Sequence, residues 1–371
     1  MSKMYVYDIY DLITIASNVK SDRIFDTRFI SYEIESNNFK KYAIDMVIKV
    51  ISCNVFKDLV KSYLEKKPLT LSFSYALPEG KSILHYQRFL GSFLGIYVEN
   101  LEGTTYVVIT DTLFRFKFSI PLRELLIPED IGHIFLLKLL QKNCFIIHGA
   151  LLDISGHITS IVAMPDVGKT LTSVSLALER KAKIFSDDMS IICADGKAYG
   201  LPPRSISLGT VSEKPLISTQ VGRLKSLLYN SPIRYLTWLP YIGFNISNLM
   251  NIPISKFNEL CGYCVDKGSG VPEYLFILEK GGDSIKTKSL ESIEASEKVL
   301  NTAIREWYYF DINPLLLKYA YANSNFKFFT LLKKREEIIK AFVSKIPNIM
   351  LVRAPSSIMF KDIIYKIVSL S

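Results

Sequence analysis

The stretch HITSIVAMPDVGKTLTSVSLALERK, residues 157–181, decides how this chain folds. Its first part is rich in β-branched residues, which predicts a strand over 157–162. Leu171, Val174 and Leu178 recur at helical spacing, which predicts a helix over 171–181. Residues 163–170 are therefore expected to form a loop between a strand and a helix.

This loop fits the phosphate-binding pattern G-x-x-x-x-G-K-[ST] at three of its four defined positions. Backbone amides of such a loop, together with the positive end of the following helix, form a site for an anion. Lys169 is the expected phosphate lysine, and the hydroxyl of Thr170 suits Mg²⁺. The predicted nucleotide-binding residues are Ala163, Met164, Pro165, Asp166, Val167, Gly168, Lys169, Thr170 and Leu171.

Two residues depart from the pattern. Ala163 adds a methyl group where glycine is usual, and Asp166 places a negative charge in the loop. That charge would weaken phosphate binding by about 1 kcal/mol unless it faces solvent or pairs with a cation. A weakened nucleotide site and a different donor such as pyrophosphate both stay open. An ordinary strand–turn–helix is disfavoured, because a lysine at a helix start is slightly unfavourable without an anion.

Three further polar residues are candidates for the same site. Asp187 and Asp188 lie on a strand predicted over 182–192, which should end beside the loop. Neighbouring residues on a strand face opposite sides, so the two carboxylates are expected to have different roles. His148 lies on a strand predicted over 143–154, where a lone histidine can equally be a core residue.

Five short runs, in this order, resemble HPr kinase/phosphorylase and its wider relatives, which share a fold with phosphoenolpyruvate carboxykinase. The runs are FIIHGAL (145–151), SG (155–156), AMPDVGKT (163–170), SDD (186–188) and PPRSISL (202–208). The resemblance covers about residues 130 to 210. It implies an α/β fold: a P-loop core with a mixed β-sheet over 128–371, preceded by an N-terminal α+β module over 1–127 that is rich in antiparallel strands.

The resemblance also implies an ATP- and Mg²⁺-dependent phosphotransferase with Asp187, Asp188, His148 and Lys169 as its catalytic residues. Thr170 and one aspartate, assigned to Asp188, would hold Mg²⁺, while the other aspartate would act as general base. Arg204 would lie on the substrate side. The acceptor would be a serine or similar hydroxyl of a carrier protein, a peptide or free serine. The alternative function is a non-catalytic nucleotide-binding partner or regulatory module.

Hydrophobic periodicity outlines the rest of the chain. Strands are predicted over 69–75, 95–99, 105–110, 114–120, 274–278 and 349–352, with a hairpin turn at 102–103. Helices are predicted over 42–63, 128–142, 289–307, 328–343 and 360–370.

The composition and net charge limit which partners and which location are expected for the chain. The 371 residues carry a net charge of +9 without a dense Lys/Arg run, so no nucleic-acid partner is expected. No apolar run is long enough to predict a membrane span. Five cysteines, an odd number, with no recognisable signal peptide predict a reducing, cytoplasmic location. Homo-oligomerisation stays open.

Overall fold

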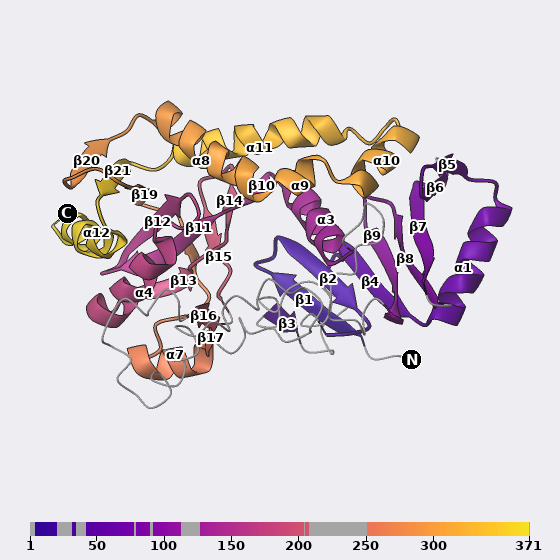
Figure 1. Cartoon of the computed structure of the whole chain (residues 1–371), viewed down its shortest axis with the longest axis horizontal. Helices are drawn as coiled ribbons and strands as arrows, with labels where there is room; N and C mark the ends of the chain where they lie inside the picture. Colours follow the sequence, from indigo (N-terminus) through magenta and orange to yellow (C-terminus); the bar gives the residue numbers. More distant parts are fainter. Residues whose placement is uncertain are drawn as a thin grey trace. The chain divides into compact units, whose positions relative to one another are not determined.

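A computed structural model of the chain describes residues 4–20, 32–34, 42–77, 79–89, 92–112, 127–203, 205–207 and 251–370. These residues form a mixed α/β fold, which confirms the predicted class (Figure 1). The chain divides into two compact units. The first comprises Met1–Asn143 and Trp307–Arg335, and the second comprises Cys144–Glu306 and Glu336–Ser371. The first unit thus extends beyond the predicted boundary at 127/128 and includes a segment that returns late in the sequence.

The first unit contains a nine-stranded sheet in the order β3-β1-β2-β4-β9-β8-β7-β6-β5. Strand β4 pairs in parallel with β2 and β9, and the other neighbours are antiparallel. The antiparallel character predicted for this region is therefore present. The strands are β1 (Tyr5–Ile9), β2 (Ile13–Ser17), β3 (Glu33–Ile34), β4 (Met46–Ile51), β5 (Leu69–Leu71), β6 (Ser74–Leu77), β7 (Ser82–Phe89), β8 (Ser92–Glu99) and β9 (Thr105–Thr110). The strand predicted over 114–120 lies outside the described residues.

The helix predicted over 42–63 is wrong in its first half. Strand β4 occupies that half, and helix α1 (Cys53–Glu65) begins only after Ser52, whose hydroxyl accepts a hydrogen bond from the amide of Val55. The apolar spacing of this segment suits a helix, but its run of β-branched residues favours a strand. Parallel pairing with β2 and β9 gives that preference its partners.

Helix α1 packs closely on the sheet because strand β8 carries a glycine. Phe56, Val60 and Tyr63 of α1 form a buried cluster with Leu84. A Cβ atom on Gly95 would lie 2.6 Å from the Phe56 ring. The missing side chain therefore lets the aromatic ring contact the strand backbone.

Helix α3 (Ile127–Gln141) belongs to the first unit because its polar groups are bonded there. The ammonium group of Lys138 donates to the carbonyl of Leu101 at 2.8 Å, and burial lowers the pKa of this lysine to about 8. Asn313, the cap of helix α10 (Pro314–Ala322), donates to Asp130 at 2.6 Å. The short helix α9 (Tyr308–Asp311) precedes it.

The second unit contains a six-stranded sheet in the order β13-β11-β12-β19-β21-β20 (Figure 1). Its three central strands, β12 (His157–Ala163), β19 (Tyr274–Lys280) and β21 (Asn348–Ala354), run parallel, so their carboxyl ends meet at one edge. Strand β11 (Gly149–Ile154) pairs antiparallel with β12 and with β13 (Lys183–Ser186), and β20 (Lys286–Ser289) pairs antiparallel with β21. Beside it lie a four-stranded sheet of β10 (Cys144–Ile147), β14 (Ser190–Cys193), β15 (Ala198–Gly200) and β18 (Ser269–Gly270), and a pair of β16 (Ser205–Ser207) with β17 (Asn251–Pro253).

Two of the predicted strands are each split between these sheets. The segment 143–154 forms β10 and β11, and the segment 182–192 forms β13 and β14. His148 is the single residue between β10 and β11, while Asp187 and Asp188 lie in the bend between β13 and β14. All three candidate residues are therefore at points where the chain passes from one sheet to the other.

Helices cover both faces of the six-stranded sheet. Helices α4 (Lys169–Arg180) and α12 (Phe360–Ser369) pack on each other and on the strands, with Ile161, Phe276 and Phe360 in the shared core. Val162 and Ile277, the next residue along each strand, are also buried but face the other way, and α8 (Ser292–Glu306) packs on β12 and β19. The described residues also form helices α7 (Ile254–Cys261) and α11 (Phe328–Val343).

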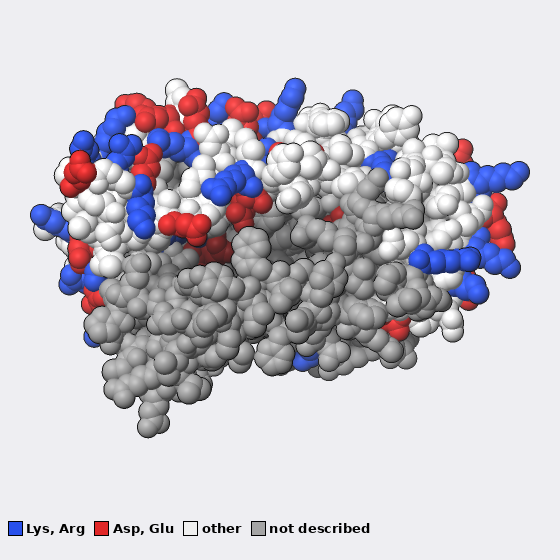
Figure 2. All heavy atoms as spheres, in the orientation of Figure 1, with Lys and Arg blue, Asp and Glu red and all other residues white. Residues whose placement is uncertain are grey.

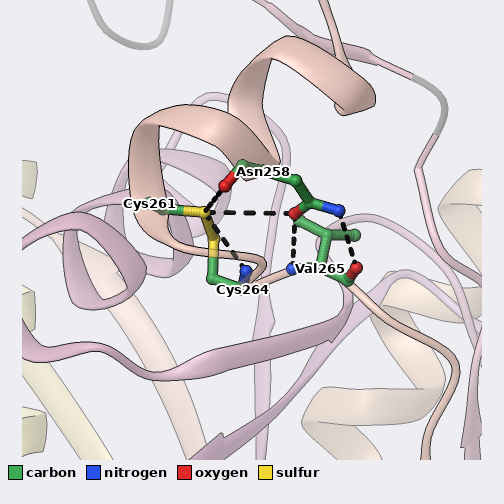
Figure 3. The surroundings of a disulfide bond; sticks show 4 residues. All are labelled: Asn258, Cys261, Cys264 and Val265. Carbon is green, nitrogen blue, oxygen red and sulfur yellow. Dashed lines mark hydrogen bonds between the residues drawn. A yellow bond between two sulfur atoms is a disulfide. The ribbon is translucent and has the colours of Figure 1, made fainter.

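Four of the five cysteines are paired, which the sequence did not predict. Cys144 and Cys193 join β10 to β14, and Cys261 and Cys264 form a small loop at the end of α7 (Figure 3). In that loop the side chain of Asn258 bonds to both backbone polar groups of Val265. Cys53 is a free thiol. Disulfides are typical of oxidising compartments, so the cytoplasmic location stays a prediction.

The described surface is mixed in charge. Figure 2 shows basic and acidic side chains intermixed over the described part of one face. Ion pairs among the described residues include Lys288 with Glu294 and Lys298 with Glu279. Within the described ranges, no helix has the length and apolar character needed to cross a bilayer.

Candidate functional site

The 163–170 loop leaves the carboxyl end of β12 and enters α4, as the sequence predicted. Strand β12 ends at Ala163 and the helix begins at Lys169. Gly168 has a φ of 115°, in the left-handed region, and a Cβ atom there would lie 2.4 Å from the Cβ of Ser357. Both the backbone conformation and the close neighbour therefore require glycine at this position.

The two departures from the motif have local explanations. Ala163 is buried at the end of β12, where its methyl group joins the core between the sheet and α4. Asp166 is exposed to solvent at the tip of the loop, with a φ of 64°. Its carboxylate is therefore well hydrated, which reduces the predicted penalty on phosphate binding.

Lys169 is a buried ammonium group directed at the bend between β13 and β14. Its side chain is 5% exposed, and Nζ donates to the carbonyl of Asp187 at 2.8 Å and to that of Asp188 at 3.3 Å. Nζ also lies 3.3 Å from Oδ1 of Asp188. Burial lowers the pKa of Lys169, while the charges of Asp188 and Asp187 oppose that shift. A desolvated cation is thus held beside two carboxylates at the first residue of α4.

The two aspartates have different environments. Asp187 is 6% exposed overall, whereas the side chain of Asp188 is 43% exposed. A bend rather than strand alternation produces this difference in exposure, and the division of roles between the pair stays a prediction. Asp188 is the more accessible of the two to a ligand.

His148 connects Asp188 to a residue that the sequence did not indicate. Nε2 of His148 lies 3.2 Å from Oδ1 of Asp188, and Nδ1 lies 3.0 Å from Oε2 of Glu306, the last residue of α8. Ionised carboxylates only accept hydrogen bonds, so a doubly protonated ring can donate to both and a neutral ring to one. The two carboxylates satisfy both ring nitrogens of this largely buried side chain, which is compatible with a site role and with a hydrogen-bonded core residue.

A second residue missed by the sequence supports the loop from outside. Ser357 begins the short 3-10 helix η6 (Ser357–Met359), which follows β21, and its hydroxyl donates to the carbonyl of Val167 at 2.7 Å. Only pairing of distant strands brings this segment to the loop, so no local pattern could have identified it.

A cavity of about 400 Å³ opens beside the loop at the carboxyl ends of the parallel strands. Met164 and Val167 form its loop side. Leu278, the Glu279–Arg353 ion pair and the backbone of Gly281 and Gly282 form its strand side. In open α/β sheets, ligands bind at this edge of the strands.

The residues at the site fit Mg²⁺ bound together with a phosphate ligand. Mg²⁺ usually keeps several waters and takes only one or two protein ligands in addition to phosphate oxygens. Thr170, half-buried in the first turn of α4, and Asp188 are the predicted pair. In the part of the chain that the structure describes, no three His, Cys, Asp or Glu side chains group to hold a metal by themselves. Arg204, the predicted substrate residue, lies outside the described residues.

Comparison with known proteins does not assign this chain to a family. No protein-family model matches it, and no curated protein matches it in sequence. The fold and the site define a mixed α/β protein in which a loop lysine, two aspartates and a histidine converge at one sheet edge. The likeness to HPr kinase stays a prediction from the sequence.

Proposed function

We propose that this protein is an ATP- and Mg²⁺-dependent phosphotransferase, similar to HPr kinase, that phosphorylates a serine or similar hydroxyl of a protein, peptide or small molecule. One observation carries the proposal. The buried ammonium group of Lys169, at the start of α4, meets the bend of Asp187 and Asp188. A buried cation, a helix start and two carboxylates are the groups needed to bind a phosphate and activate a hydroxyl beside it.

The order of the strands suggests how ATP would lie. The cavity is on the β19 and β21 side of the loop, while Asp188 and His148 are on the β13 and β11 side. With the nucleoside in the cavity and the β-phosphate on the loop, the γ-phosphate would lie toward Asp188. The acceptor would then approach from the β13 side.

The chain's own residues would carry out the transfer. The acceptor oxygen bonds to the γ-phosphorus as the bond from that phosphorus to the bridging oxygen breaks, and ADP leaves. One of the two aspartates takes the hydroxyl proton, and Lys169 and the amides of α4 stabilise the phosphate charge. Mg²⁺, when bound by Thr170 and Asp188, would neutralise further phosphate charge.

The test is turnover of ATP with free serine, serine peptides and carrier proteins as acceptors. We expect ADP release that depends on an acceptor, and its loss in Asp187→Asn or Asp188→Asn variants that still bind ATP. ATP binding without turnover by the parent protein against every acceptor would contradict the enzyme.

A second function is a nucleotide-binding module without catalysis. The observation that favours it is the contact between Lys169 and Asp188, which gives the lysine an acidic partner within the protein. This function predicts ATP binding with no phosphate release, and equal ATP affinity in the parent and in an Asp187→Asn variant.

A further inference from the structure

Glu306 contacts the proposed site through His148. Its Oε2 lies 3.0 Å from Nδ1 of the histidine, whose Nε2 lies 3.2 Å from Asp188. Asp188 in turn lies 3.3 Å from Nζ of Lys169. A continuous row of polar contacts thus runs from the end of α8 to the first residue of α4.

The position of Glu306 is unfavourable for the helix itself. Glu306 is the last residue of α8, where unpaired carbonyl groups give the helix end a partial negative charge. A basic residue is preferred in this turn, and Arg305 meets that preference. A carboxylate here requires a compensating partner, and His148 is that partner.

The two contacts of His148 fix the direction of its ring. The His148 side chain is 15% exposed and that of Glu306 is 30% exposed, so the contact is largely shielded from water. A half-turn of the ring about its bond to Cβ would put a carbon atom in place of Nδ1 and break the bond to Glu306. The carboxylate therefore selects one ring orientation, the one in which Nε2 faces Asp188.

We propose that Glu306 is a positioning residue of the site: it accepts a hydrogen bond from Nδ1–H of His148 and so holds Nε2 toward Asp188. The expected effect of Glu306 on catalysis rests on the proposed function. The contact between Glu306 and His148 can be tested without any turnover. By holding His148 against Asp188, Glu306 would orient one of the two carboxylates proposed as base, as a third group orients the base in other sites.

The first test reads the histidine directly by ¹⁵N NMR of the full-length protein, with the His148 signals assigned by their loss in a His148→Asn variant. In the parent we expect a proton on Nδ1 of His148, bonded to Glu306, and one on Nε2, bonded to Asp188. In Glu306→Gln the amide oxygen still accepts, so the Nδ1 proton stays. In Glu306→Ala the Nδ1 proton loses its acceptor, so we expect the Nε2–H form, whose proton Asp188 accepts. The matched control is Glu294→Ala, on the same helix, where the carboxylate pairs with Lys288 instead. An unchanged His148 spectrum in Glu306→Ala would overturn the proposal.

The second test separates positioning from folding. We expect Glu306→Ala to lower kcat on the order of 10- to 100-fold with the Kd for ATP unchanged. Glu306→Gln should retain most of kcat, and Glu294→Ala all of it. An unchanged kcat, or a parallel loss of ATP binding, would overturn the positioning role in catalysis. If the parent shows no turnover at all, the proposed function fails, and the NMR result still decides whether Glu306 orients His148.

Discussion

The ammonium group of Lys169 donates to the backbone carbonyl of Asp187 at 2.8 Å, although the two residues belong to different elements of the second unit. This bond ties the first residue of α4 to the bend that carries both aspartates. An anion bound at the helix start would therefore interact electrostatically with the two carboxylates beside it.

Replacing Lys169 should remove anion binding without unfolding the protein. Lys169→Ala takes away a charge-assisted contact, which is worth about 1.5–3 kcal/mol or roughly 10- to 100-fold in affinity. The measurement is the rise in melting temperature caused by ATP. The control Lys197→Ala removes a lysine between β14 and β15 whose ammonium lies over Tyr199, and it should retain the rise. An undiminished shift in Lys169→Ala would contradict both proposed functions.

As the pH is raised, the affinity for ATP should begin to fall at a pH below the ordinary lysine pKa of 10.5. Only the protonated Lys169 attracts phosphate, and burial places its pKa below the ordinary lysine value of 10.5. A bound anion favours the protonated form of Lys169. At a pH above the pKa that Lys169 has in the ligand-free protein, ATP binding is therefore accompanied by proton uptake. Affinity is thus maintained below that pKa and declines as pH rises through it. Calorimetry in buffers of different ionisation enthalpy would measure the uptake, and its absence up to pH 10 would argue against this role of Lys169.

Gly168→Ala should destabilise the second unit more than an alanine at another left-handed glycine. At Gly156, with φ of 94° and no atom within 4 Å of an added Cβ, alanine costs only backbone strain, about 1 kcal/mol. At Gly168 the clash with Ser357 adds to that strain, so we expect about 3 kcal/mol or more in denaturant unfolding. Combining Gly168→Ala with Ser357→Gly removes the clashing atom and should restore part of the loss. Equal effects at the two glycines would show that Ser357 does not crowd the loop.

The cavity beside Met164 should favour ATP over inorganic triphosphate. Met164 is 38% exposed on the cavity wall, and packing a nucleoside against it should contribute about tenfold in affinity. We expect Met164→Ala to weaken ATP binding by up to that factor and to leave triphosphate binding unchanged. Met359→Ala changes a methionine that is 40% exposed and does not line the cavity, so it serves as the control. Equal binding of ATP and triphosphate by the parent would place the nucleoside elsewhere.

The disulfide between β10 and β14 should stabilise the protein more than the one after α7. Cys144 and Cys193 are 49 residues apart, against 3 for Cys261 and Cys264. Loop-closure entropy gives about 4 kcal/mol for the longer loop and about 2 kcal/mol or less for the shorter. Urea unfolding of the two double-serine variants would measure the difference, provided that non-reducing mass analysis finds both bonds in the parent. Free thiols at all five cysteines would instead support the predicted reducing location.

Local sequence was sufficient for the loop itself. Leu171, Val174 and Leu178 indicated the helix after it, and Gly168 with Lys169 indicated its special backbone and charge. Periodicity failed at residues 46–51, where apolar spacing was compatible with a helix but β-branched side chains and two neighbouring strands favoured β4.

The supporting residues of the site could not be predicted in this way. Glu306 lies 158 residues after His148, and Ser357 lies 190 residues after Val167. Neither belongs to a motif, because each acts through one contact that only the completed sheet creates. The splitting of 143–154 and 182–192 was equally hidden, since apolar runs show that a strand is buried but not which sheet it joins.

The bond from Ser357 to Val167 has a consequence for biosynthesis. A ribosome makes the chain from its amino end, so the 163–170 loop is made long before Ser357, which bonds to it. Strands β19 and β21 are also made after the loop. A nascent chain that stops short of η6 has the lysine and both aspartates but lacks the serine that bonds to the loop. Competence to hold a ligand in this loop would then arise only after residues 357–359 have been made.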